Sequence, residues 1–404
     1  MPQIAPFRGL TYNAKTAGNL SRMLTLPYDV ISPKLREAYY AASPFNIVRA
    51  DFRKGKTDAK YRGAARELAG WVSKGILTRD EQPAFYLLEQ TFKSDGRLFK
   101  RTGFYALVKA EEFSKKQVLP HEETFPKHKQ DRLKLLRACK AHTSPIFGVY
   151  DGKFNWSVIK KSKPGLKFTL RDGGQRVKGK IWRITELAAV SGIVSFMKRR
   201  RIFIADGHHR YETALAYRKE NEKKYGRRPE APWNFTLFAL VSMQDFGLAV
   251  CPTHRVVKFS TPVTLKVLLE RLGKDFSVTP CAPTASKKEL VFYTGGKCYS
   301  LKPRTRNIPL KIALKRSAAW KRLSTSVLHH LVLKALPPVK DIAYIRDLRE
   351  TLTAADSKRF EAAFLVPAIS PADIRKTAVK LERMPHKSTY FYPKLPAGAV
   401  INKF

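Results

Sequence analysis

The stretch ADGHHRYETAL (205–215) places an aspartate, a glycine, two histidines and an arginine side by side. An apolar run at 202–205 precedes it and favours a short buried strand, while residues 211–218 favour a helix. At such a strand-to-helix turn, backbone N–H groups and the helix dipole favour an anion. Gly207 lets the backbone approach a ligand closely, and Arg210 can donate two hydrogen bonds to a phosphate. The predicted phosphate site consists of Gly207, His208, His209 and Arg210. The alternative is a plain turn capped by its aspartate with both histidines facing solvent, and the turn alone does not decide between the two.

Three further stretches carry charged or hydroxyl side chains in suggestive combinations. They are LPYDVIS (26–32), PHEETFPKHKQDRLKLL (120–136) and RMPHKSTYFYPK (383–394). Their candidate residues are Asp29 in the first, His121, Glu122, Lys127, His128, Asp131 and Arg132 in the second, and Lys387, Ser388, Thr389 and Lys394 in the third. Each also has an ordinary explanation: a turn cap, a pair of exposed charges four residues apart on a helix, or an edge strand. Together with the turn they supply the carboxylates and cations that phosphoryl transfer requires.

A metal site is a second interpretation of the histidines and carboxylates. The candidate ligands are His121, Glu122, Asp206, His208 and His209. Adjacent residues at the start of a helix point about 100° apart, so His208 and His209 do not readily bind one ion together. This geometry weakens the case for a metal site, but a metal-dependent phosphoesterase stays an alternative to a phosphotransferase.

The elements that would position these residues mix helices and strands without an internal repeat. Helices are expected at 58–74, 126–141, 211–218, 327–336 and 370–384, and strands at 83–92, 97–108, 144–150, 235–243 and 362–368. Hairpin turns are expected at 94–96 and 295–296, and residues 151–180 suggest a polar surface hairpin or insertion. Because strands and helices mix and hairpins occur, the predicted class is α+β (mixed α/β).

Composition places the chain among globular proteins. With 404 residues and 44% hydrophobic content, it can form two or three domains with real cores. The cysteines are widely separated, which argues against a zinc knuckle or a disulfide framework; they are Cys139, Cys251, Cys281 and Cys298. The first residues lack the apolar core of a signal peptide, and no run of about 18 apolar residues occurs, so we expect a cytoplasmic protein with no membrane partner.

The charge balance is far from neutral. The 77 lysines and arginines against 33 acidic residues give a net charge of +44. Nucleic acid is the obvious partner for such an excess, because bound cations release its counterions. The cations are nevertheless spread along nearly every segment, with modest concentrations at 160–163, 198–201 and 223–228. A general drift toward basic residues gives the same distribution, so a nucleic-acid-binding protein is an alternative function rather than the leading one.

Several motifs together resemble one protein family. They are PFRGLTYN, PYDVIS, SPFNIVR, HEETFPKHKQDRLKLL, SPIF, ADGHHRYETAL and MPHKSTYFYPKLPAGAV. Nearly from end to end, the sequence resembles a bacterial and archaeal family known as domain of unknown function 1015. Within it, DGHHRYETA is similar to the nucleotide-phosphate loop of the ParB and sulfiredoxin-like superfamily, which includes kinases of free serine.

The second resemblance implies a fold and a reaction. We expect a ParB/sulfiredoxin-like nucleotide-binding core at 1–260, with additional hairpins and an insertion near 151–180. A C-terminal α/β domain would follow at 261–404, and its last segment, 383–404, would return to the core. The implied reaction moves a phosphate from a nucleotide, ATP or ADP with magnesium, to the hydroxyl of a small molecule, with free L-serine as the expected acceptor.

The resemblance also implies roles for individual residues. The turn residues Gly207, His208, His209 and Arg210 would bind phosphate, together with Lys387, Ser388 and Thr389. Asp206 would orient the loop or contact magnesium. Glu122 is the first choice for the carboxylate that activates the acceptor hydroxyl, and Asp29 is the second. The expected supporting residues are His121, Lys127, Asp131 and Arg132.

Overall fold

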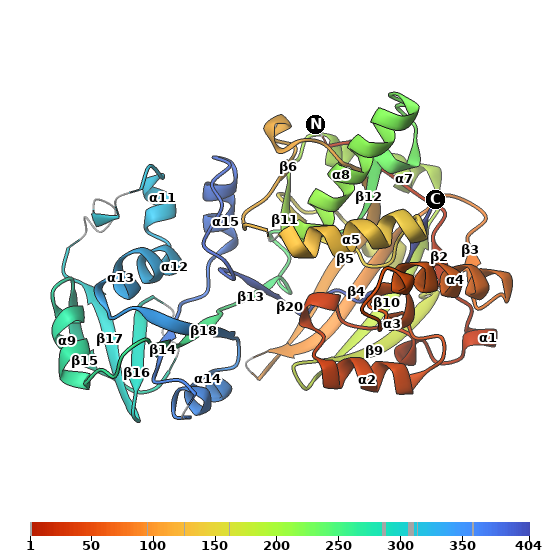
Figure 1. The fold of residues 1–404 in the computed structure, drawn as a ribbon. Coiled ribbons are helices and arrows are strands. Elements are labelled where there is room, and N and C mark those ends of the chain that lie inside the picture. The colour runs from red at the N-terminus through yellow and green to blue at the C-terminus, as the bar shows by residue number, and fades with distance from the viewer. Residues whose placement is uncertain are drawn as a thin grey trace. The chain divides into compact units, whose positions relative to one another are not determined.

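The computed structural model describes residues 2–94, 96–124, 126–160, 162–284, 288–305, 311–312, 314–357 and 359–404, and of residues 126–128, 158 and 160 it describes only the backbone. The chain divides into two compact units, whose elements are labelled in Figure 1. The first unit contains Met1–Pro120, Thr124–Ala249 and Pro393–Phe404. The second contains His121–Glu123 and Val250–Tyr392.

The first unit is built on a main sheet to which nine of the described strands belong. Their order across the sheet is β6-β11-β8-β12-β5-β4-β10-β9, and β1 also pairs with β5. The strands are β1 (Ile4–Ala5), β4 (Phe85–Ser94), β5 (Arg97–Lys109), β6 (Val118–Leu119), β8 (Ile146–Tyr150), β9 (Leu166–Asp172), β10 (Gln175–Ile184), β11 (Ile202–Asp206) and β12 (Phe235–Ser242). Most neighbours run antiparallel, but β6 runs parallel to β11, and β8 runs parallel to β12.

Two small strand pairs and a set of helices complete this unit. The pairs are β2 (Leu10–Tyr12) with β3 (Leu77–Arg79) and β7 (Ala141–His142) with β21 (Asn402–Lys403). The helices are α1 (Ala14–Ala17), η1 (Leu20–Arg22), η2 (Tyr28–Val30), α2 (Pro33–Ala42), α3 (Val48–Asp51), α4 (Ala59–Ser73), η3 (Phe113–Lys115), α5 (Pro126–Cys139), α6 (Ser157–Lys160), α7 (Leu187–Lys198), α8 (His208–Tyr225) and η4 (Pro232–Asn234). No described helix combines the length and the apolar character that crossing a bilayer requires.

Burial explains the arrangement around the sheet. Every residue of β12 is buried, as its strongly apolar sequence predicts for a central strand covered on both faces. α7 and α8 pack on the sheet: their Met197 and Tyr211 join Phe104 and Phe238 in one core. α5 contacts both α4 and α8, so these three helices form a continuous layer (Figure 1). The predicted helix at 58–74 and strand at 235–243 are thereby confirmed. β4 and β5 pair antiparallel on either side of the turn predicted at 94–96, of which residue 95 lies outside the described residues.

The polar segment at 151–180 differs in part from its prediction. Its second half forms the β9–β10 hairpin, and β10 pairs with β4 along seven residues from Ile184 to Lys178. The hairpin is therefore the edge of the main sheet. In β10, the alternate residues Val177, Gly179 and Ile181 are buried, and the lysines and arginines between them conceal this pattern in the sequence.

The second unit contains an antiparallel sheet of six described strands in the order β15-β17-β16-β19-β14-β18. These are β14 (His254–Phe259), β15 (Phe276–Pro280), β16 (Leu290–Thr294), β17 (Lys297–Pro303), β18 (Val339–Ile345) and β19 (Ala362–Leu365). The helices are α9 (Leu265–Gly273), α11 (Ala318–Lys321), α12 (Ser324–Val327), η5 (Leu328–Val332), α13 (Leu333–Ala335), α14 (Leu348–Ala355) and α15 (Pro371–Ala378). The short strands β13 (Ala249–Cys251) and β20 (Tyr390–Tyr392) pair with each other. α15 starts at the predicted Pro371, capped by Ser370, but it ends well before residue 384. The mixed α+β class is confirmed.

The division between the units falls at other residues than we expected. The units separate at 249/250 and not at 260/261, because β14 pairs with β18 and β19 inside the second sheet. The returning segment is also shorter: residues 383–392 stay in the second unit, and the part that belongs to the first unit is Pro393–Phe404.

Candidate functional site

The DGHHR stretch forms the connection between β11 and α8. Asp206 ends the strand, and Gly207 has φ 92° and ψ 29°, in the left-handed region. The helix begins at His208, three residues before the predicted start at 211, and the N–H of Tyr211 donates to the carbonyl of Gly207 over 3.0 Å. The prediction was wrong because one left-handed glycine suffices to turn the chain, so the histidines and Arg210 form the first turn of the helix.

Gly207 is required for two reasons. Its positive φ strains any residue with a Cβ atom. A Cβ atom at this position would also lie 2.8 Å from Nε of Arg210, inside van der Waals contact. The guanidinium of Arg210 therefore folds back over the turn in the space that the missing side chain leaves.

Two cations face the carboxylate of Asp206. Oδ2 lies 3.5 Å from a terminal nitrogen of Arg210 and 3.3 Å from Nζ of Lys394. The side chain of Arg210 is 12% exposed, that of Lys394 is 7% exposed and that of Asp206 is 19% exposed. Solvent therefore screens these charges only weakly. The turn thus has an excess of positive charge next to the positive end of a helix dipole, which favours an anion.

Both cations are fixed by further contacts inside the first unit. Arg210 donates to Oγ of Ser144 over 2.9 Å and to the carbonyl of Pro145. The backbone N–H of Lys394 donates to Oδ2 of the buried Asp172 over 2.9 Å. The sequence did not predict Ser144 or Asp172 as partners, although the SPIF motif contains the first.

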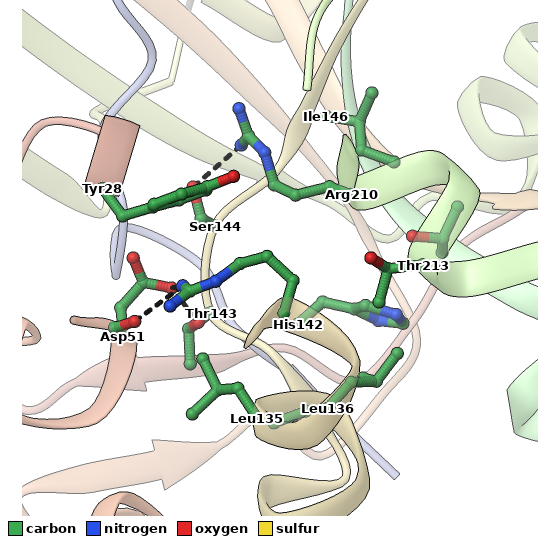
Figure 2. Close-up of a pocket in the computed structure, with 13 residues that line it drawn as sticks. Tyr28, Asp51, Leu135, Leu136, His142, Thr143, Ser144, Ile146, Arg210 and Thr213 are labelled. Atoms are coloured by element: carbon green, nitrogen blue, oxygen red, sulfur yellow. Dashed lines mark hydrogen bonds and ion pairs between the residues drawn. The ribbon is translucent and has the colours of Figure 1, made fainter. Parts of the chain in front are cut away.

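A small cavity lies beside Arg210 (Figure 2). Its lining includes Tyr28, Asp51, Arg132, Ser144 and Arg210, and it has room for about 50 Å³ of water-sized occupants. Pockets for small molecules have volumes of about 300–1,000 Å³, so this cavity is too small to enclose a nucleotide.

The PYD motif contributes to this same cavity. Asp29 lies in η2 and is exposed, whereas its neighbour Tyr28 is buried with its ring 4.1 Å from the guanidinium carbon of Arg132. Burial raises the pKa of the Tyr28 hydroxyl, and Asp29 and Asp206 raise it further against the lowering effects of Arg132 and Arg210. The N-terminal motif and the turn are thus close enough to interact electrostatically.

Asp131 and Arg132 belong to a buried network of charges. Asp131 accepts from Nζ of Lys60 over 2.8 Å and from the hydroxyl of Tyr61 over 2.7 Å, and it pairs with Arg132. Burial alone would raise the pKa of Asp131, but Arg132 and these hydrogen bonds outweigh it and hold the pKa well below its ordinary value. The side chain of Lys127 lies outside the described residues. In the described chain, Asp131 connects α4 to α5.

Arg132 also contacts a second acidic residue, Asp51. Its Nη1 donates to the backbone carbonyl of Asp51 over 2.7 Å, and the carboxylate oxygen Oδ1 of Asp51 accepts from the hydroxyl of Thr143 over 2.6 Å. Asp51 and Asp131 raise the pKa of Arg132 although burial opposes them. Arg132 is therefore committed to α3 and its neighbours.

In the second unit, the HEE and KST motifs meet. Nε2 of His121 lies 2.8 Å from Oγ1 of Thr389, and Oε1 of Glu122 accepts from the N–H and the hydroxyl of Thr389 over 3.2 and 3.1 Å. Arg383 donates to the carbonyl of Glu122 over 3.0 Å. His121 is completely buried, and the Glu122 side chain is largely so. The carboxylate of Glu122 is thus held in a fixed orientation.

The buried Arg255, which the sequence analysis missed, supports the same loop. Its guanidinium donates to the carbonyls of His386 and Lys387 over 3.2 and 3.0 Å. Burial lowers the pKa of Arg255 to about 10, so it stays charged at neutral pH. Lys387 has φ 54°, and these two hydrogen bonds hold the loop in that left-handed conformation.

The predicted phosphate residues differ in how accessible their side chains are. Ser388 is buried and donates to Oγ1 of Thr325 over 3.1 Å, and the hydroxyl of Thr389 contacts Glu122. His208 is buried, and His209 is half-buried. The hydroxyls of the KST motif therefore already have protein partners, whereas Lys387 is half-exposed.

The donor set does not make a magnesium site. Among the residues that the structure describes, no three His, Cys, Asp or Glu side chains are placed to hold a metal ion. Oδ2 of Asp206 faces two cations, which compete with a metal for that oxygen. The turn by itself fits an anion and not a divalent cation.

The chain resembles several solved structures and matches one family model. No curated protein matches the sequence. A conserved hypothetical protein from Pyrococcus furiosus has 12% identity, with 72% of this chain and 93% of that chain covered and a TM-score of 0.36. A free serine kinase variant in complex with AMP has 12% identity, with 71% and 87% covered and a TM-score of 0.37. SbnI with a C-terminal truncation, from Staphylococcus aureus, has 10% identity, with 72% and 84% covered and a TM-score of 0.37. The family model "Protein of unknown function (DUF1015)" matches residues 4–326, and the chain therefore belongs to that family.

Proposed function

We propose that this protein is a phosphotransferase that moves a phosphate from ATP or ADP to the hydroxyl of a small molecule, with free L-serine as the acceptor. The observation that carries the proposal is the pair of cations, Arg210 and Lys394, on Asp206 at the start of α8. The resemblance of the DGHHR sequence to the phosphate loop of free-serine kinases supplies the substrate class.

The phosphates bind at the outer side of the β11–α8 turn. Gly207 has no side chain, so phosphate oxygens can approach the backbone there, and the helix dipole stabilises their charge. Arg210 is a planar donor suited to two phosphate oxygens, and Lys394 adds a point charge. Asp206 has a positioning role, because it holds both cations at the turn before the nucleotide arrives.

Two carboxylates take the acceptor side of the reaction. Glu122 accepts the proton of the acceptor hydroxyl as the new P–O bond forms, and Thr389 keeps its carboxylate oriented. Asp29 is exposed and binds the ammonium group of serine, a role that requires only a negative charge. No step is assigned to magnesium.

The direct test is to incubate the purified protein with ATP or ADP and free L-serine and to measure phosphoserine by mass spectrometry. Arg210→Ala should weaken nucleotide binding by about 10- to 100-fold, the effect of losing a charge-assisted hydrogen bond. Arg137→Ala is the matched control, because Arg137 forms an exposed ion pair with Glu220. Nucleotide affinity that is unchanged in Arg210→Ala would refute the phosphate site. Nucleotide binding without phosphoserine would refute serine as the acceptor.

A further inference from the structure

A second positively charged site lies at the opposite end of β11. Its lining residues define what we call the basic groove: Pro2, Lys115, Lys116, Gln117, Lys198, Arg199, Arg200 and Arg201. The groove is open and has about 360 Å³ of space, much more than the cavity beside Arg210. Its described lining contains six cations and no carboxylate.

Strand pairing explains why these cations meet. β6 and β11 run parallel, with Val118 opposite Ile202, and the N–H of Ile202 donates to the carbonyl of Gln117 over 2.9 Å. In a parallel pair, the segments that precede both strands must lie at the same end of the sheet. One of these segments is KKQ (115–117), and the other is KRRR (198–201). Two basic runs far apart in sequence are thereby joined at the edge of the main sheet (Figure 1).

Five of the six cations are available to a ligand. Lys115, Lys116, Lys198, Arg199 and Arg201 are exposed, and in the described parts of the chain none of them forms an ion pair. Arg200 differs, because it stacks over Phe196 at 3.5 Å and donates to the carbonyl of the same residue. Concentrated positive charge with no carboxylate in the described lining raises the local potential and attracts a polyanion.

A purely structural explanation accounts for only part of the groove. Cations near the end of α7 stabilise the negative end of its dipole, which explains Lys198 and Arg199. Lys115 and Lys116 come from another segment, and Arg201 lies beyond the helix. Lys116 also has φ 56°, a conformation that costs a lysine energy. Capping of α7 therefore does not explain why the two basic segments lie together.

We propose that the basic groove binds the phosphodiester backbone of a nucleic acid duplex. The described lining brings together six cations from two segments, 115–117 and 198–201, and such a set suits contacts to several phosphates. No aromatic side chain is part of the described lining, so the stacking platform typical of single-strand binders is missing there. The five-residue strand β11 separates the groove from the Asp206 turn by about 15 Å, so this site is distinct from the proposed nucleotide site.

The test compares two variants of the full chain with equal net charge. The groove variant is Lys116→Gln, Arg199→Gln and Arg201→Gln combined. The control is Arg62→Gln, Arg66→Gln and Lys74→Gln combined, which removes three exposed cations without ion pairs from α4 and the turn after it. Binding of a short fluorescent DNA duplex of mixed sequence is measured by anisotropy from about 50 to 200 mM salt.

We expect the groove variant to bind more weakly and to lose between two and three units of the slope of log K against log salt, about 0.9 for each lost phosphate contact. The control variant should keep the affinity and the slope of the natural chain. Equal losses in both variants would show binding through diffuse charge and would overturn the proposal. Absence of duplex binding in the natural chain, or groove-dependent binding of anionic lipid vesicles or inorganic polyphosphate without duplex binding, would also overturn it.

Discussion

Nζ of Lys394 lies 3.3 Å from Oδ2 of Asp206 and connects the segment Pro393–Phe404 to the start of α8. Lys394 is almost completely buried, and this carboxylate contributes to the compensation of its charge. Arg210 is the second cation on the same carboxylate.

Lys394→Met should lower the free energy of unfolding by about 3 kcal/mol, the low end of the range for breaking a buried ion pair. Asp206→Asn should also destabilise the protein, because it removes the carboxylate that faces both Lys394 and Arg210. In the double variant, the loss should be smaller than the sum of the single losses by at least about 1 kcal/mol. Urea unfolding of the four proteins measures this coupling. Strictly additive losses would mean that the two groups do not interact.

Gly207→Ala should destabilise the protein more than Gly174→Ala does. Both glycines have positive φ, 92° and 80°, so both substitutions pay for backbone strain of about 1 kcal/mol or more. Only at Gly207 does the added Cβ atom meet a neighbour, Nε of Arg210, whereas nothing lies within 4 Å at Gly174. Thermal unfolding should rank the two variants, and only Gly207→Ala should weaken nucleotide binding. Equal effects of the two substitutions would contradict the role of Arg210 at the turn.

Glu122→Gln should lower turnover in the phosphoserine assay by about 10²–10⁴-fold, the usual effect of losing a general base, and leave nucleotide binding intact. Glutamine keeps an oxygen that can accept from Thr389, so the local structure should persist. The control is Thr389→Val, which removes a hydroxyl but no carboxylate, and it should reduce turnover less. A glutamine variant with full turnover would exclude Glu122 as the base.

Asp131→Asn tests the buried network through pH. The pKa of Asp131 is lowered in the folded protein, so its contribution to stability is complete above the unfolded value of about 4 and is lost as pH falls below it. The difference in unfolding free energy between the natural chain and the variant should therefore be constant from neutral pH down to about pH 5 and should shrink in more acidic solution.

Asp58→Asn is the matched control for this pH series. Asp58 forms an exposed ion pair with Lys134, and such pairs contribute less than about 1 kcal/mol. Urea unfolding at a series of pH values compares the two substitutions. A difference for Asp131→Asn that stays the same at acidic pH would contradict the assigned network.

Local patterns predicted the elements whose residues determine them. The strongly apolar sequence of β12 and the spacing of Ala64 and Leu68 in α4 correspond to buried positions in the structure. The turn at 206–210 could also be predicted, because a strand, a glycine and a helix follow one another there. The exact start of α8 could not, since one glycine dihedral angle decides it.

Contacts between distant segments were beyond such reasoning. The sequence suggested that the HEE and KST motifs serve one site, but the hydrogen bonds of Thr389 to Glu122 depend on how the second unit folds. The same holds for Lys394 and Asp172, and for Arg255, whose surroundings in the sequence look like an ordinary strand. Of the two segments that form the groove, the sequence pointed only to 198–201; the parallel pairing of β6 with β11 is what places 115–117 beside it.

The membership of Pro393–Phe404 in the first unit has a consequence for how the chain is made. The ribosome finishes residues 1–249 long before it reaches Lys394, and the whole second unit is synthesised in between. Until then Leu10 lacks the bridge to Ile401, β7 lacks its partner β21, and Asp206 lacks one of its cations. The first unit therefore cannot complete its native structure until the second unit has been synthesised, and a nascent chain arrested between the units carries an Asp206 turn without Lys394.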